Sequence, residues 1–186
     1  GVAGVSIDFT LPDLVDTLAA GPLPVAADRI GRLRERLDAK DAGGVAEIAP
    51  DYLPLIAAAG PFASAMAQLR AFDTDGVLTS RLDGLAAITA AIPDSVRLTL
   101  DPTERHGFEY QTWLGFSIFA AGVAREVGRG GTYRIVHGDG AEEVATGFSL
   151  YADAIIATTG PVDRRRLFLP FGTPAADGAR MRADGW

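Results

Sequence analysis

The sequence predicts an α+β fold, and three observations support that prediction. Apolar residues recur at helical spacing through most of the first half of the 186-residue chain. After Pro93 the pattern changes to alternating and aromatic runs that are typical of strands. Apolar residues make up 48% of the chain, which is enough for a real core. Because helices come first and most strands follow them, the order favours α+β over repeated βα units.

The N-terminal region predicts one strand followed by helices. Residues 5–9 alternate apolar and polar side chains, as in a strand with one buried face. Pro12 begins a helix that ends at Gly21-Pro22, because proline suits a helix start and the glycine-proline pair stops it. A second helix follows Asp28, and Asp41 is expected to cap a further helical turn.

Residues 51–92 are rich in alanine and predict further helices. Breaks are expected at Gly60-Pro61 and at residues 73–76, where turn-forming residues gather. Apolar stripes at helical spacing are best explained by packing in the core. The residues of the first half that we expect there are Leu14, Val15, Leu18, Ile30, Leu33, Leu37, Val45, Ile48, Leu82, Leu85 and Ile88.

The second half begins with two strand signals. Residues 96–100 alternate, and the run 108–121 is rich in aromatic and β-branched side chains, the strongest β signal in the chain. We expect this run to form a central strand of an antiparallel sheet. Alternation with period two places Leu114, Phe116 and Ile118 together on a buried face.

Further strand pieces are predicted at 125–127 and 132–136, with a turn at 138–140. Residues 148–156 then pass from a strand into a helix. The turn between the first two pieces is predicted from three glycines, Gly128, Gly130 and Gly131.

The chain is expected to divide after residue 160. Residues 1–160 form the main domain, with a helical segment at about 11–92 and an antiparallel meander at about 95–157. Residues 161–186 form a short extension, which cannot bury its apolar faces alone and must pack on the main sheet or begin a further unit. The extension is predicted to contain a strand at Leu167–Pro170 and a helix at about Pro174–Asp184.

Composition argues against several classes of function. The chain has no cysteine and only two histidines, His106 and His137, so thiolate sites and multi-histidine metal sites are excluded. No phosphate-binding loop motif occurs, and we expect no metal and no cofactor. The net charge of −7 disfavours nucleic acid as a partner. Neither a membrane-spanning apolar stretch nor a signal-peptide pattern is present, so we expect a cytoplasmic protein without a membrane partner.

Several motifs leave two interpretations open when each is considered alone. The glycines at 128–131 form a turn or allow a ligand to approach the backbone. Glu142-Glu143 is a surface pair or an acid/base pair, and Arg164-Arg165-Arg166 is a solvated strand entrance or an anion site. Together these residues support a domain with a polar pocket in its second half.

Four segments occur in a defined order: Leu37-Asp38-Ala39-Lys40-Asp41, Gly107-Phe108-Glu109-Tyr110-Gln111-Thr112, Gly130-Gly131-Thr132-Tyr133-Arg134 and Thr146-Gly147-Phe148-Ser149-Leu150. In this order, with a meander between them, they resemble histidyl-tRNA synthetase and its catalytically inactive relative, the ATP phosphoribosyltransferase regulatory subunit. The similarity covers residues 5–185. The part of that family that carries motifs 1 and 2 lies outside this sequence.

Departures from the synthetase pattern favour the inactive relative. Three positions that hold arginine in the synthetase are occupied here by His106, Thr132 and Ala154. Activation of an amino acid with ATP needs cations at the developing phosphoryl charge, and none of these side chains replaces a fixed guanidinium. The resemblance therefore implies that this chain is not an enzyme and has no catalytic residues.

The same resemblance implies a fold and a role. The fold is a class II aminoacyl-tRNA synthetase-like antiparallel sheet flanked by helices, with a helical insertion in the N-terminal half. The role is a non-catalytic regulatory subunit that activates the short-form catalytic ATP phosphoribosyltransferase and confers histidine feedback on the first step of histidine biosynthesis. A homodimer within a hetero-oligomer is expected.

The resemblance also implies a site for a histidine-like ligand. Glu109 can pair with the ammonium or an imidazole N–H, and Tyr110 and Tyr133 can bond the ring or the carboxylate. Gly130 and Gly131 let backbone amides approach. Alternatively, these are ordinary sheet residues. Two other functions remain open: a fragment of a histidyl-tRNA synthetase, hence a ligase, or an amino-acid-binding domain without a transferase partner.

Overall fold

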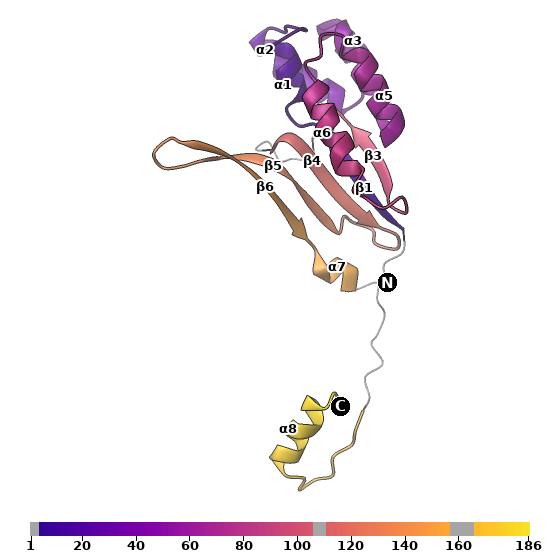
Figure 1. Ribbon diagram of the computed structural model, residues 1–186, viewed down its shortest axis with the longest axis vertical. Helices are drawn as coiled ribbons and strands as arrows, with labels where there is room; N and C mark the ends of the chain where they lie inside the picture. The colour runs from indigo at the N-terminus through magenta and orange to yellow at the C-terminus, as the bar shows by residue number, and fades with distance from the viewer. Residues whose placement is uncertain (1–3, 106–110, 157–165) are drawn as a thin grey trace.

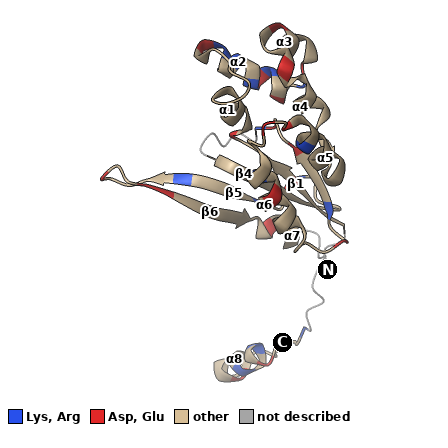
Figure 2. Cartoon of the chain, turned by 45° about the horizontal axis from the view of Figure 1, so that its top comes forward, with Lys and Arg blue, Asp and Glu red and all other residues tan. Residues whose placement is uncertain are grey.

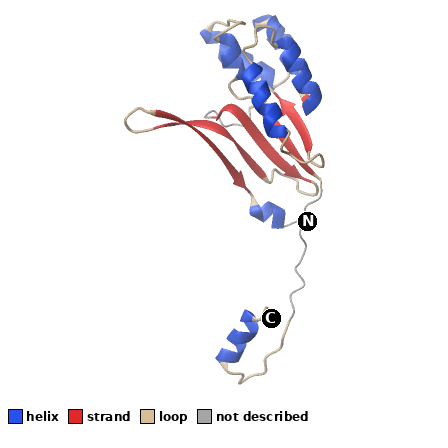
Figure 3. Ribbon diagram, viewed as in Figure 1, coloured by secondary structure: helices blue, strands red, loops and turns tan. Residues whose placement is uncertain are grey.

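The computed structural model describes residues 4–105, 111–156 and 166–186, and its main body is an α+β arrangement (Figures 1 and 3). One mixed sheet has the strand order β2-β3-β1-β4-β5-β6. Its strands are β1 (Val5–Thr10), β2 (Gly60–Pro61), β3 (Arg97–Asp101), β4 (Gln111–Ala120), β5 (Gly128–Val136) and β6 (Glu142–Leu150). The helices are α1 (Leu14–Ala19), α2 (Ala27–Asp38), α3 (Ala42–Ile48), a 3-10 turn (Pro50–Tyr52), α4 (Leu53–Ala57), α5 (Phe62–Phe72), α6 (Thr79–Thr89), α7 (Ala152–Ile156) and α8 (Ala175–Ala183).

The helices α1–α6 gather at the β1–β3 side of the sheet and form the main core with it (Figure 3). The ring of Phe9 in β1 lies 5.7 Å from the ring of Phe62 in α5. The predicted apolar stripes are largely buried here, from Leu14 in α1 to Leu85 in α6. The prediction was wrong for Ile88, which is 40% exposed because the buried stripe of α6 ends before its last turn.

The cap predicted at Asp41 is confirmed. Its Oδ1 atom accepts a hydrogen bond of 2.9 Å from the backbone N–H of Gly44 at the start of α3. That bond, together with the guanidinium of Arg36, lowers the pKa of the Asp41 carboxyl below its ordinary value. An unpaired donor of the helix N-terminus is thereby satisfied.

The sequence predicted an antiparallel sheet, but the observed sheet is mixed. β1 and β3 are parallel, with Ser6 beside Arg97 and Thr10 beside Asp101. The connection between them contains all the helices of the first half, and a crossover of that length permits parallel pairing. Gly60-Pro61, expected as a simple break, forms the short strand β2 on the outer edge of β3.

β4, β5 and β6 form the predicted antiparallel meander, and β4 is central in the sheet. The turn at 138–140 is confirmed. Two details were wrong. Residues 125–127 belong to the loop between β4 and β5, and the glycines assigned to a turn lie inside β5, where they pair with β4 and β6.

β4 contains a bulge that modifies the predicted alternation. Its register with β5 shifts between Thr112 and Gly115, and Trp113 in the bulge has a φ of 55°. Leu114 is buried, whereas Phe116 and Ile118 are only partly buried. Phe116 lies opposite Phe9 in β1 and packs against the main core.

The C-terminal segment, residues 166–186, lies apart from the sheet (Figure 1). The helix predicted there is confirmed as α8. The strand predicted at 167–170 is wrong, because a strand needs a neighbour for its hydrogen bonds and none pairs with this segment among the described residues. Phe168 and Phe171 are exposed. None of the helices in the described ranges is long and apolar enough to cross a membrane.

Candidate functional site

A hollow of about 440 Å³ lies over the middle of β5 and β6. Residues of one sheet face line most of it, because Gly131 and Tyr133 of β5 pair with Gly147 and Ala145 of β6. Phe116 and Phe9 belong to the other face, which α5 covers. The lining residues are Gln111, Arg129, Gly130, Gly131, Tyr133, Gly147, Phe148, Ser149 and Tyr151.

Glycines make the floor of this pocket. A Cβ atom at Gly130 would lie 2.5 Å from the carbonyl oxygen of Gly147, and one at Gly131 would lie 2.5 Å from that of Leu114. Real Cβ atoms do not approach backbone oxygens so closely, so both positions require glycine. The facing pair Gly131 and Gly147 also leaves the sheet without side chains there, and the hollow results.

Tyr133 forms one wall of the pocket. Its ring lies over Gly147, where an added Cβ would meet the ring at 3.4 Å. The side-chain amide of Gln111 donates a hydrogen bond of 3.3 Å to the Gly130 carbonyl and lies beside the same floor. Tyr133, Gln111 and Ser149 therefore bring hydroxyl and amide groups to one place, which suits a small polar ligand.

Arg129, which also lines the pocket, is paired with a glutamate behind the lining. Arg129 donates from Nε to Glu126 Oε2 at 3.0 Å and from Nη2 at 2.8 Å. The hydroxyl of Ser117, which is 1% exposed, donates to the same oxygen at 3.1 Å. This cluster was not among the residues predicted from the sequence. Its only signal was an acid and a base three residues apart, Glu126 in a piece expected to be a strand and Arg129 among glycines expected to form a turn.

The structure brings three of the five predicted site residues together, because Gly130, Gly131 and Tyr133 all line the hollow. Glu109 and Tyr110 lie outside the described residues. The next residue, Gln111, lies in the pocket wall. Gln111 and Arg129 are thus additions to the predicted set.

Two of the positions that hold arginine in the synthetase have structural roles here. The hydroxyl of Thr132 bonds to the Thr112 carbonyl and accepts from the Leu114 N–H at 3.1 Å, so it satisfies the backbone of the β4 bulge. Ala154 in α7 is 3% exposed and packs with Ala120 and Val127. The third position, His106, lies outside the described residues.

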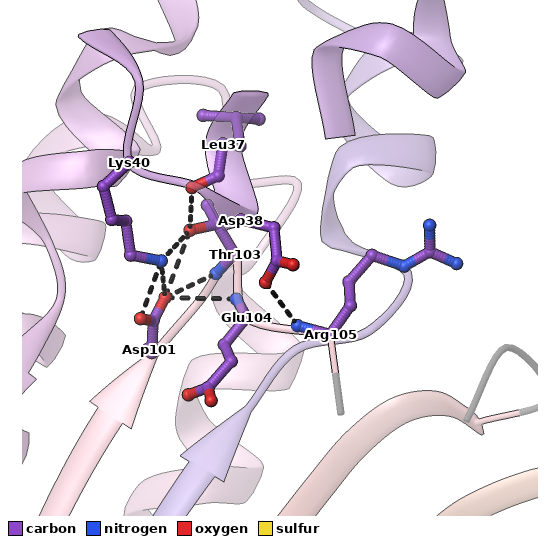
Figure 4. Close-up of polar contacts among 7 residues, drawn as sticks. All are labelled: Leu37, Asp38, Lys40, Asp101, Thr103, Glu104 and Arg105. Atoms are coloured by element: carbon purple, nitrogen blue, oxygen red, sulfur yellow. Dashed lines mark hydrogen bonds and ion pairs between the residues drawn. The ribbon is translucent and has the colours of Figure 1, made fainter. Parts of the chain in front are cut away.

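The segment Leu37–Asp41 joins α2 to the end of β3 (Figure 4). The ammonium of Lys40 lies 2.7 Å from Asp101 and 2.7 Å from the hydroxyl of Thr103. Thr103 in turn donates to the Leu37 carbonyl, and Asp38 accepts from the backbone N–H of Arg105. These contacts fix the chain as far as Arg105, just before the stretch that carries Glu109.

Figure 2 marks charged residues on several helices and at the turn between β5 and β6. The described ranges contain no group of three or more histidine, cysteine, aspartate or glutamate side chains placed to hold a metal ion. The chemistry available at the pocket is therefore hydrogen bonding, aromatic contact and one guanidinium.

Comparison with known proteins agrees with this architecture. A family model described as histidyl-tRNA synthetase matches residues 1–155. ATP phosphoribosyltransferase regulatory subunits of Rhodospirillum centenum and Rhodospirillum rubrum are 45% and 34% identical, each over 100% of this chain. The chain covers 49% of the first and 50% of the second, so it spans about half the length of the curated relatives it matches.

Two solved structures share the fold. An ATP phosphoribosyltransferase regulatory subunit/histidyl-tRNA synthetase from Bacillus halodurans has a TM-score of 0.63 at 17% identity and covers 84% of this chain and 45% of its own. An ATP phosphoribosyl transferase complex from Thermotoga maritima has a TM-score of 0.62 at 16% identity, with coverages of 80% and 53%. The fold is that of a class II synthetase-like domain. By its sequence, the chain belongs to the histidyl-tRNA synthetase family.

Proposed function

We propose that this chain is part of a non-catalytic regulatory subunit of ATP phosphoribosyltransferase. The observation that carries the proposal is the 45% identity to such a subunit over the entire chain. The proposed partner is the short-form catalytic transferase, and the proposed effect is activation together with feedback by histidine. We also propose that the subunit forms a homodimer within the hetero-oligomer, acts in the cytoplasm, and divides into segments 1–160 and 161–186.

The absence of catalysis is part of the proposal, and two positions support it. Thr132 uses its hydroxyl to satisfy the β4 bulge, and Ala154 lies in an apolar cluster. Neither can place a cation beside a developing phosphoryl charge. These features also count against the alternative of an active histidyl-tRNA synthetase fragment.

The hollow over β5 and β6 is the proposed histidine site. Its volume lies within the range of small-molecule pockets, about 300–1,000 Å³. Tyr133 and Gln111 offer hydrogen bonds to an imidazole or an ammonium group, and the glycine floor lets the ligand approach the backbone. Glu109 is proposed to pair with the ligand cation. Feedback then requires that histidine binds more tightly to one assembly state of the complex than to the other.

The test combines the full-length protein with a short-form transferase. We expect faster phosphoribosyl transfer in the complex than with the transferase alone, and inhibition of the complex by histidine. We expect no histidine-dependent ATP–pyrophosphate exchange by the full-length protein. Clear exchange would establish the ligase alternative. Histidine binding without any effect on the transferase would instead favour an amino-acid-binding domain without that partner.

A further inference from the structure

We propose that Arg129, held in place by Glu126, binds the carboxylate of the ligand and makes the pocket selective for ligands with a free carboxylate. The inference rests on the proposed function in one respect, since it takes the hollow over β5 and β6 to be the ligand site. Arg129 lies outside the four motifs that carry the family resemblance. It is also none of the three positions, 106, 132 and 154, at which this chain departs from the synthetase.

Arg129 lies on the face of β5 that forms the pocket. It lies two residues before Gly131 on β5, so alternation puts its side chain on the pocket face, and it lines the hollow. Thr132, where the synthetase has an arginine, belongs to the opposite face. Arg129 and Thr132 therefore lie on opposite faces of β5.

The guanidinium of Arg129 is held in place by its neighbours. Glu126 accepts from Nε and Nη2 of Arg129, and the side chains of the two residues are 22% and 23% exposed. Ser117, which is buried, donates to the same carboxylate oxygen. A guanidinium already fixed by neighbours loses little further conformational entropy when a ligand binds. Glu126 is thus a positioning residue, and it is not itself among the lining residues.

Arg129 brings a positive charge to the hollow. Among the described residues that line the hollow, Arg129 is the only one with a charged side chain. An arginine presents planar donors that match both oxygens of a carboxylate, whereas the neutral groups around it do not distinguish an acid from an amide or an alcohol. A ligand such as histidine would place its carboxylate at Arg129 and its ring towards Tyr133.

The experiment measures binding by titration calorimetry on the full-length protein with three probes. Histidine carries all of its groups, histamine lacks the carboxylate, and imidazole propionate lacks the ammonium. We expect Arg129→Gln to weaken histidine and imidazole propionate by about 10- to 100-fold, the value of one charge-assisted contact, and to leave histamine unchanged. Glu126→Gln should lower the ratio of histidine to histamine affinity by a smaller factor.

Arg125→Gln is the matched control. Arg125 is an exposed arginine four residues away that pairs with Asp153 outside this hollow, so its loss should not alter the preference among the probes. Thermal unfolding of each variant checks that the fold is retained, and the affinity ratio between probes within one variant is independent of the fraction folded.

The outcomes separate this proposal from the proposed function. If Arg129→Gln keeps the wild-type ratio of histidine to histamine affinity, the assignment of Arg129 is overturned while histidine binding stands. If the wild type binds imidazole propionate through Arg129 but not histidine, Arg129 keeps its role and the histidine function falls. If none of the probes binds the wild type, the role of Arg129 and the proposed histidine site are both overturned, while activation of the transferase is tested separately.

Discussion

Replacing Gly84 by alanine should destabilise the protein, although the same change in most helices is stabilising. Gly84 lies within α6, and a Cβ atom there would stand 2.7 and 2.8 Å from two ring atoms of Trp113. An indole ring is rigid, and Trp113 is held in the β4 bulge at a φ of 55°. Either the helix or the bulge must therefore move.

The magnitude follows from two opposing effects. Alanine is favoured over glycine in a helix by about 0.5–1 kcal/mol, and overpacking of a core typically costs about 1–3 kcal/mol. We expect Gly84→Ala to lower the free energy of unfolding by about 1–2 kcal/mol net. At this chain length that corresponds to a fall in Tm of roughly 2–8 °C.

Gly31→Ala in α2 is the control, because a Cβ there meets nothing within 4 Å. This variant should gain about 0.5–1 kcal/mol. Urea unfolding followed by far-UV circular dichroism measures both changes and does not depend on Trp113. Gly84→Ala should cost less stability when it is made in a Trp113→Phe background than in the wild type, since the smaller ring leaves room for the methyl group. If Gly84→Ala gains as much stability as Gly31→Ala, the reasoning is refuted.

Three further predictions concern pH, self-association and the ligand. Burial raises the pKa of Tyr52 to about 12 from 10.0, so the unfolded chain loses this proton first and stability should fall as the pH rises from 10 towards 12. In thermal melts across this range Tyr52→Phe, which lacks the hydroxyl that bonds to the Leu23 carbonyl, should lose less stability than the wild type; equal losses would contradict the assignment. Val144 and Phe148 on β6, the last strand of the described sheet, are 69% and 71% exposed, so Val144→Lys should reduce self-association of this chain in light scattering without changing its circular dichroism. Glu109→Gln in the full-length protein should weaken histidine binding by about 10- to 100-fold in calorimetry, and equal affinities would argue against a role for this carboxylate.

Local patterns were enough to predict much of this fold. The alternation at 5–9 predicted β1, the acidic residue at 41 predicted the cap of α3, and the aromatic run predicted β4 as a central strand. Each of these signals lies within a few residues of chain. The parallel pairing of β1 with β3 could not be predicted in this way, because it depends on how a crossover of many residues returns to the sheet.

The glycines of β5, at the candidate site, also could not be interpreted correctly from local sequence alone. In sequence, Gly128, Gly130 and Gly131 have the composition of a turn. Their requirement for glycine comes from oxygens of β4 and β6, which are distant in the chain. The cluster around Arg129 was missed for a similar reason, since its partner Glu126 is itself bonded to Ser117 of β4, and the loop after β4 brings these residues together.

The contact between Lys40 and Asp101 could be followed by chemical labelling of the lysine amine. Lys40 is the only lysine in the sequence, so besides the α-amino group an acylating reagent has a single side-chain target. Its nitrogen must leave Asp101 and Thr103 before it can attack. The labelling rate at this one site would therefore report how often the junction of α2 and β3 opens, and mass spectrometry would follow that opening separately from unfolding of the whole domain.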